Sequence, residues 1–267
     1  MKTDSRHLRA RDYVQKLAAS GRYHFTSRQA RDALGVSADA AKLALNRLSR
    51  QRLIASPARG FYVIVPPEYR SLGCLPADQF IPALMERQGL PYYAGLLSAA
   101  QYYGAAHHRP QETQIFLARN RRPIKCGAVR VVFIARKRLE EVPVRNFNTL
   151  RGTLRVSTPE ATAVDLAGYP RRAGGLGQVA TILSELAESI APALLARAAA
   201  TAPVPWAQRL GYLLEEVGAG DKALALKAYV QSHARAYVPL LPGEPEKDPR
   251  RAADWKLRIN AVVEPEL

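Results

Sequence analysis

The chain has 267 residues, 48% of them hydrophobic, so it can build two domains with buried cores and is too apolar to be largely disordered. A formal net charge of +16 favours an anionic partner such as nucleic acid, and no apolar run approaches the roughly 20 residues of a membrane helix. Two cysteines, Cys74 and Cys126, argue against a disulfide scaffold, and the polar start "MKTDSRHLRA" is no signal peptide, so we expect a cytoplasmic protein.

The positive charge is concentrated near the N-terminus, where residues 1–70 hold 14 Lys/Arg and 5 Asp/Glu. The sequence predicts an amphipathic helix over residues 5–19 and a second helix from the stretch "TSRQARDALG". In that stretch Thr26 and Gln29 have capping-box spacing, and Gly35 suits the C-terminal end. Ser37 is then the natural N-cap of a third helix, "ADAAKLALNRLSRQ".

At 100° per residue, the third helix has one apolar face and one polar face. Ala41, Ala44, Leu45 and Leu48 should pack inward. The opposite face carries polar side chains, with Leu43 and Arg47 at its flank: Asp39, Lys42, Asn46, Ser49 and Arg50.

The stretch "RLIASPARGFYVIVPP", residues 52–67, predicts a β-hairpin directly after this helix, with Arg59 at its tip. Helix, "GVS" turn, basic helix and hairpin together predict a winged helix-turn-helix that binds duplex DNA. RNA is disfavoured because no aromatic stacking strip is present. A polar helix face that is merely solvated remains the alternative. The predicted DNA-binding residues are Ser37, Lys42, Asn46, Arg47, Arg50 and Arg59.

Pro66-Pro67 favours a linker, so the predicted domains are residues 1–67 and 68–267. The predicted fold class is α+β: an N-terminal winged helix-turn-helix is followed by a larger domain of mixed helices and strands. Strands are predicted in "TQIFLAR", "AVRVVFIAR", "GTLRVS" and "DWKLRINAVV". Helices are predicted in "ADQFIPALMERQG" and "AGLLSAAQYYGAA", from Thr158 onward, and around residues 175–190, 191–200, 205–217 and 220–235.

Three blocks of this larger domain resemble the C-terminal domain of AbiEi-type antitoxins: "YYAGLLSAAQYYGAAHHRPQETQIFLARNRRPI", "RVSTPEATAVDLAGY" and "QRLGYLLEEVG". The resemblance covers most of residues 70–218. It implies an antitoxin of a type IV toxin–antitoxin system that represses its own operon at promoter inverted repeats, as a monomer or weak dimer binding cooperatively. It also implies a nucleotidyltransferase-like toxin that is counteracted without a stable complex. A solitary regulator without a toxin is the alternative, and the residues after about 220 resemble nothing known to us.

A second basic cluster lies between residues 119 and 138, a range without acidic residues. It is either a solvated sheet edge protected by charge against aggregation or a second surface for DNA or a partner. Arg130 also lies in this range, and the residues predicted to form the second surface are Arg119, Arg121, Arg122, Lys125, Arg136, Lys137 and Arg138.

No catalytic, metal or cofactor site is predicted. His107-His108 has no third ligand at a suitable spacing and favours a loop pair. Glu160 is predicted to stabilise a helix N-terminus. It lies five positions before Asp165, so the two acids do not share a helix face well. The stretch "RRAGGLGQ" lacks the Lys-Ser/Thr of a phosphate loop, and Glu246-Lys247 lies in a Pro-rich loop. A nucleic-acid-processing enzyme is therefore the less favoured alternative.

Overall fold

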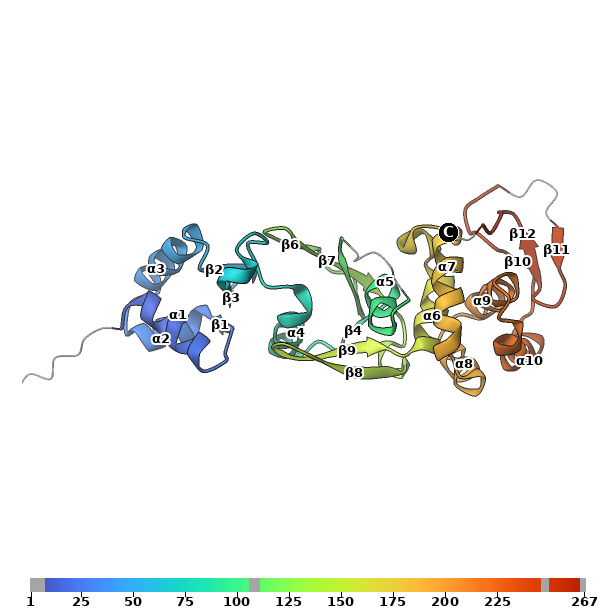
Figure 1. Ribbon diagram of the computed structural model, residues 1–267, viewed down its shortest axis with the longest axis horizontal. Helices are drawn as coiled ribbons and strands as arrows, with labels where there is room; N and C mark the ends of the chain where they lie inside the picture. Colours follow the sequence, from blue (N-terminus) through green and yellow to red (C-terminus); the bar gives the residue numbers. More distant parts are fainter. Residues whose placement is uncertain (1–7, 106–110, 246–249, 265–267) are drawn as a thin grey trace, which may run out of the picture. The chain divides into compact units, whose positions relative to one another are not determined.

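The computed structural model describes residues 8–105, 111–245 and 250–264 (Figure 1). Two compact units divide the chain: residues 1–91, 121–133 and 146–154 form the first, and the remaining residues form the second. Two later segments of the chain therefore group with the N-terminal part. No helix in the described ranges is long and apolar enough to cross a membrane.

The first unit begins with three helices and a three-stranded antiparallel sheet of order β1-β3-β2. The elements are α1 (Ala10–Ala19), β1 (His24–Thr26), α2 (Ser27–Leu34), α3 (Ala38–Arg50), β2 (Ile54–Ala58) and β3 (Phe61–Ile64). This is the element order of a winged helix-turn-helix. The first helix begins at Ala10, since Arg9 is extended, and the start expected at residues 5–7 lies outside the described residues. The strand β1 is absent from the predicted elements.

The predicted local signals explain where α2 and the hairpin begin and end. The Thr26 hydroxyl accepts from the Gln29 N–H at 3.1 Å, and the Thr26 N–H donates to Gln29 Oε1 at 2.8 Å, so the capping box is confirmed. Gly35 ends α2 in the left-handed region with φ 63°. Gly60 has φ 68° at the hairpin turn, and the β2–β3 register shifts between Ala55 and Ala58.

Helices α1 to α3 and strands β1 to β3 make up the winged-helix part, and its interior is aromatic and aliphatic. Phe25, Leu45 and Ile54 are almost fully buried, and the Tyr13 ring meets the Phe25 ring edge-on at 5.4 Å. The rest of the first unit includes the 3-10 helices η1 (Pro67–Tyr69) and η2 (Ala77–Gln79), helix α4 (Ile81–Gln88) and strand β6 (Ile124–Cys126).

Arg151 ties the winged-helix part to the rest of the first unit. Its guanidinium lies 3.9 Å from the centre of the Tyr23 ring, and it also forms an ion pair with Glu68 at 3.5 Å. A hydrogen bond to Gln79 completes the contact. Tyr23, next to β1, is therefore packed against a side chain that comes much later in the sequence.

A six-stranded sheet of order β6-β7-β5-β4-β9-β8 is followed along the chain by a group of helices. Its strands are β4 (Tyr93–Ala94), β5 (Thr113–Leu117), β6, β7 (Val129–Ala135), β8 (Val144–Thr149) and β9 (Gly152–Ser157). In the second unit β4 pairs antiparallel with β5 and parallel with β9. The expected strands in 113–119, 128–136 and 152–157 are confirmed.

Within the described residues, six α-helices belong to the second unit, and they lie where the sequence predicts helices. They are α5 (Leu96–Ala100), α6 (Pro159–Gly168), α7 (Leu176–Leu186), α8 (Pro192–Ala199), α9 (Val204–Glu216) and α10 (Leu224–His233). Thr158 caps α6 by accepting from the Ala161 N–H at 3.3 Å, and Pro159 takes the first helical position, as predicted.

The segment after residue 220 completes the core of the second unit. Beyond α10, the strands β10 (Val238–Pro239), β11 (Arg250–Ala252) and β12 (Leu257–Ile259) form a small sheet beside α9 and α10 (Figure 1). Trp255, Leu226 and Leu257 from this segment are buried in the same hydrophobic cluster as α6 and α9. The cluster is thus closed by residues that the family resemblance does not cover.

Candidate nucleic-acid interface

The helix α3 is fixed at its start by two residues of the turn that precedes it. The Ser37 hydroxyl accepts from the Ala40 N–H at 3.2 Å, and Gly35 in the left-handed conformation lets the chain reverse from α2 into α3. Ala41, Leu45 and Leu48 are buried and hold α3 against the rest of the winged-helix part. The opposite face of α3 is left open.

That open face carries the side chains predicted to bind DNA. Lys42, Asn46, Arg47 and Arg50 are all exposed, as is Ser37 at the helix start. Among the described residues, no carboxylate lies within salt-bridge distance of Lys42, Arg47 or Arg50. Three unpaired cations on one helix face are available to an external anion.

The hairpin brings a further cation to a groove beside α3. Arg59 is exposed at the turn between β2 and β3, and it lines a hollow of ≈ 550 Å³ together with Lys42 of α3 and Arg28 and Arg31 of α2. Asp32 lies near both arginines of α2, at 3.8 Å from Arg28 and 2.8 Å from Arg31. These exposed pairs are weak, so the arginines remain open to a stronger anionic partner such as a phosphate.

The second basic cluster is not one surface of free cations. Arg136 is buried and paired with Asp165, Nε to Oδ1 3.1 Å, so the expectation that it faces a partner is wrong. Arg136 directly follows β7, and its backbone N–H donates to the carbonyl of Leu117, the last residue of β5, at 2.8 Å. The side chain is thereby held against the helices.

Two other arginines of this cluster also have intramolecular partners. Arg138 forms an ion pair with Glu141 and donates to the Ala200 carbonyl at 2.9 Å. Arg121 lies over the Phe133 ring at 4.9 Å and bonds to Gln88. The exposed remainder divides between the units: Arg122 and Lys125 belong to the first, and Arg119 and Lys137 belong to the second.

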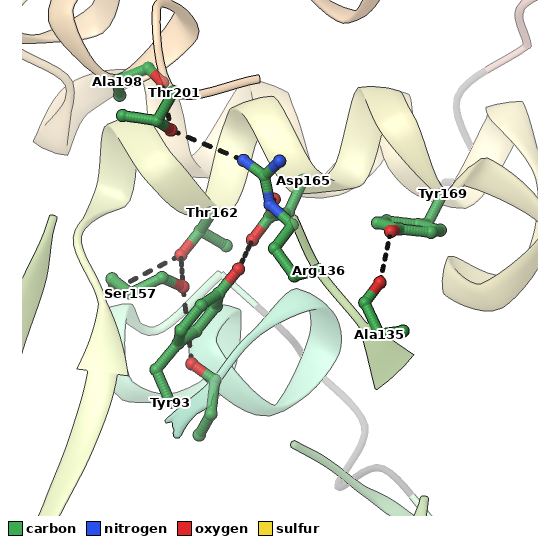
Figure 2. Close-up of polar contacts among 10 residues, drawn as sticks. Tyr93, Ala135, Arg136, Ser157, Thr162, Asp165, Tyr169, Ala198 and Thr201 are labelled. Atoms are coloured by element: carbon green, nitrogen blue, oxygen red, sulfur yellow. Dashed lines mark hydrogen bonds and ion pairs between the residues drawn. The ribbon is translucent and has the colours of Figure 1, made fainter. Parts of the chain in front are cut away.

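The buried pair is the centre of a polar network in the second unit, which Figure 2 shows. The Tyr93 hydroxyl of β4 donates to Asp165 Oδ2 at 2.8 Å. The Arg136 guanidinium lies over the Trp206 ring at 4.6 Å and reaches the Thr201 hydroxyl at 3.4 Å. The network thus joins a strand, the end of another strand, and helices α6 and α9.

Burial dominates the electrostatics of this network. Desolvation raises the pKa of Asp165 to about 6, while Arg136 and the Tyr93 hydroxyl oppose the rise. Burial likewise raises the pKa of Tyr93 well above its ordinary value, and the Asp165 charge adds to that effect. Asp165 and Arg136 are enclosed by protein, so the pair serves the fold and offers no open site.

Beside this network, Glu160 has a contact in addition to the position expected for it. It lies in the first turn of α6 as predicted, but it is buried and accepts from the Ala191 N–H at 3.1 Å. It therefore fixes the start of α8 as well.

Within the described ranges, no three His, Cys, Asp or Glu side chains are grouped so that they could hold a metal ion. His107-His108 and Glu246-Lys247 lie outside the described residues.

Residues 93–216 match the family model of the AbiEi antitoxin C-terminal domain. The fold is similar to the crystal structure of the RV2827C protein from Mycobacterium tuberculosis, with a TM-score of 0.67 and 22% identity, over 93% of this chain and 90% of that chain. A comparison with curated proteins finds no match. The structural similarity supports the mixed α+β fold, and the sequence match covers the domain that contains the Arg136–Asp165 network. Residues 93–216 thus form a domain that is similar to the AbiEi antitoxin C-terminal domain.

Proposed function

We propose that the chain is a DNA-binding transcriptional repressor and the antitoxin of a type IV toxin–antitoxin system. The observation that carries the proposal is the set of exposed cations on α3 and at the hairpin turn, for which the described residues provide no carboxylate partner, in a chain with an AbiEi antitoxin domain. Cations on a recognition helix and its wing bind the phosphates of duplex DNA, and the helix enters the major groove.

In this proposal the parts of the chain have separate roles. Residues 1–67 bind promoter inverted repeats, and residues 68–267 counteract a nucleotidyltransferase-like toxin in the cytoplasm. The chain itself catalyses no reaction. Because Arg151 packs against Tyr23, these roles are better separated by surface substitutions than by cutting the chain.

Loss of single α3 or wing cations should reduce the salt dependence of DNA binding. Each neutralised phosphate contributes about −0.9 to the slope of log affinity against log salt. Arg50→Ala and Arg59→Ala should each flatten the slope by about one unit on a promoter fragment. Arg197→Ala, which removes an exposed arginine from α8, is the matched control and should leave the slope unchanged. Equal slopes in all four proteins would contradict the proposed docking.

Asn46 is the α3 side chain best suited to read a base. An Asn amide can form hydrogen bonds to both N6 and N7 of adenine. Such a bidentate pair contributes about 1–3 kcal/mol of discrimination against the other bases. Asn46→Ala should therefore lower affinity for the promoter repeats more than affinity for random-sequence duplex. Titrations of both duplexes at one salt concentration measure this difference. A parallel fall in both affinities would assign Asn46 to the phosphate backbone.

Repression and neutralisation should separate in one host. A variant with Lys42, Arg47 and Arg50 all changed to Ala should lose repression of a reporter and still rescue growth against the neighbouring toxin at matched protein levels. If neither the wild-type protein nor the variant rescues growth, the chain is better explained as a solitary regulator. If only the variant fails to rescue growth, neutralisation of the toxin needs DNA binding.

A further inference from the structure

One apolar side chain lies in the middle of the basic face of α3. Leu43 is 59% exposed, although leucine is a residue that folding normally buries. On the helix it is neighboured by the exposed Asp39 and Arg47, one turn before and after it, and by Asn46. On the helical wheel, Leu43 lies at the flank of the polar face, but about 30° from the centre of the face that all the exposed residues of α3 form together.

Exposure alone would carry no inference, because single exposed leucines are common on protein surfaces. Other large hydrophobic side chains are also exposed in the described residues: Leu90, Leu150, Leu194, Leu224 and Val262. Leu43 differs from these in its place, since it is on the helix face that presents unpaired cations. A leucine surrounded by such groups must meet whatever surface they bind.

We propose that Leu43 is a specificity-determining residue that contacts the methyl group of a thymine in the major groove. The proposal rests on the proposed DNA-binding function and adds to it the identity of one base that the protein recognises. In the major groove, thymine alone among the four bases presents a C5-methyl group, and apolar side chains recognise it by contact. Lys42, Arg47 and Arg50 then supply the affinity for phosphates, while Leu43 and Asn46 supply recognition of adjacent bases.

The test removes one methyl group from the DNA and the side chain from the protein. The probe is a duplex selected from random-sequence DNA by the full-length protein, and each thymine in the protected region is replaced in turn by deoxyuridine. Burial of one methyl group contributes about 0.8 kcal/mol, which is about a fourfold change in affinity. We expect one of these thymine positions to be sensitive: replacing it by deoxyuridine should lower the affinity of the wild-type protein about fourfold.

Leu43→Ala should bind the thymine and deoxyuridine duplexes about equally. Alanine is a good helix former and Leu43 is exposed, so this variant should remain folded. Arg197→Ala on α8 is the control and should keep the fourfold sensitivity, because it leaves α3 unchanged.

Three results would overturn the inference, and they are distinguishable. If the protein selects no duplex, the proposed DNA-binding function fails together with it. If the protein binds but no thymine is sensitive, or Leu43→Ala is as sensitive as wild type, only the thymine contact fails. If Leu43→Ala changes the sedimentation of the protein without DNA, Leu43 belongs to a contact between two copies of the chain.

Discussion

Arg136→Met should lower the free energy of unfolding of the second unit by about 3–5 kcal/mol at neutral pH. Methionine fills similar space beside Trp206 but leaves the Asp165 carboxylate buried without its counter-ion. A buried carboxylate without a counter-ion is much less stable than one in water. The chain's two tryptophans, Trp206 and Trp255, both lie in the second unit, so denaturation followed by tryptophan fluorescence measures this loss directly.

The same variant should become less unstable as the pH falls. Arg136 lowers the pKa of Asp165, so its removal should raise that pKa above the value of about 6 that burial already causes. A carboxyl group whose pKa is higher in the folded than in the unfolded state stabilises the fold below its unfolded value, near 3.8, and loses that contribution as the pH rises. The difference between variant and wild type should therefore shrink from pH 7.5 to pH 5.

Changing both partners separates the cost of a lone charge from the loss of packing. In Arg136→Met combined with Asp165→Asn, the amide oxygen can still accept from Tyr93 and no charge is left buried. This double variant should recover a large part of the loss. The exposed pair of Arg138 and Glu141 is the control, and Glu141→Gln should change stability little. A double variant less stable than Arg136→Met would show that the pair is not coupled as described.

Local signals in the sequence predicted much of the fold because they act over a few residues. The capping box of Thr26 and Gln29, the turn at Gly35 and the cap at Thr158 are determined by neighbouring residues, and the structure has all three. The inward face of α3 follows from helical periodicity alone, and Ala41, Leu45 and Leu48 are buried as expected.

Pairings between distant residues could not be predicted in this way. Arg136 and Asp165 are 29 positions apart. From the sequence alone, Arg136 is interpreted as a basic surface residue and Asp165 as an acid on a helix, and nothing links the two. The range between residues 119 and 138 contains no acid, which suggested one uniform surface. The acids that pair with Arg136 and Arg138 lie beyond that range, at positions 165 and 141.

The grouping of the chain into units escaped prediction for a related reason. Pro66-Pro67 is a local linker signal, yet residues 121–133 and 146–154 belong to the same compact unit as the winged-helix part. That grouping depends on long-range contacts such as Arg151 on Tyr23, which no spacing in the sequence reveals. The role of the segment after residue 220 was also hidden, because its described residues beyond α10 form only strands of two or three residues and loops around Trp255.

Trp255→Ala should destabilise the second unit by about 3–5 kcal/mol, as expected when a buried aromatic side chain is deleted. Trp255 is 1% exposed, and its indole N–H donates to Glu215 Oε2 at 2.7 Å. Its ring lies against α9 at Gly211, where an added Cβ would come within 2.0 Å of ring atom Cζ3. Trp255 is therefore the largest of the side chains with which the segment after residue 220 closes the core. Trp206 fluorescence still reports unfolding in the variant.

Gly211→Ala tests the same contact from the other side. Alanine in a helix is ordinarily more stable than glycine by about 0.5–1 kcal/mol. Here we expect the opposite sign, a loss of about 1–3 kcal/mol, because Trp255 must move to admit the methyl group. In the Trp255→Ala background, the space is empty and Gly211→Ala should become neutral or stabilising. Gly220→Ala, whose Cβ would lie 3.7 Å from its nearest neighbour, is the control and should change little. The same loss from Gly211→Ala in both backgrounds would show that the helix, and not the C-terminal tryptophan, requires the glycine.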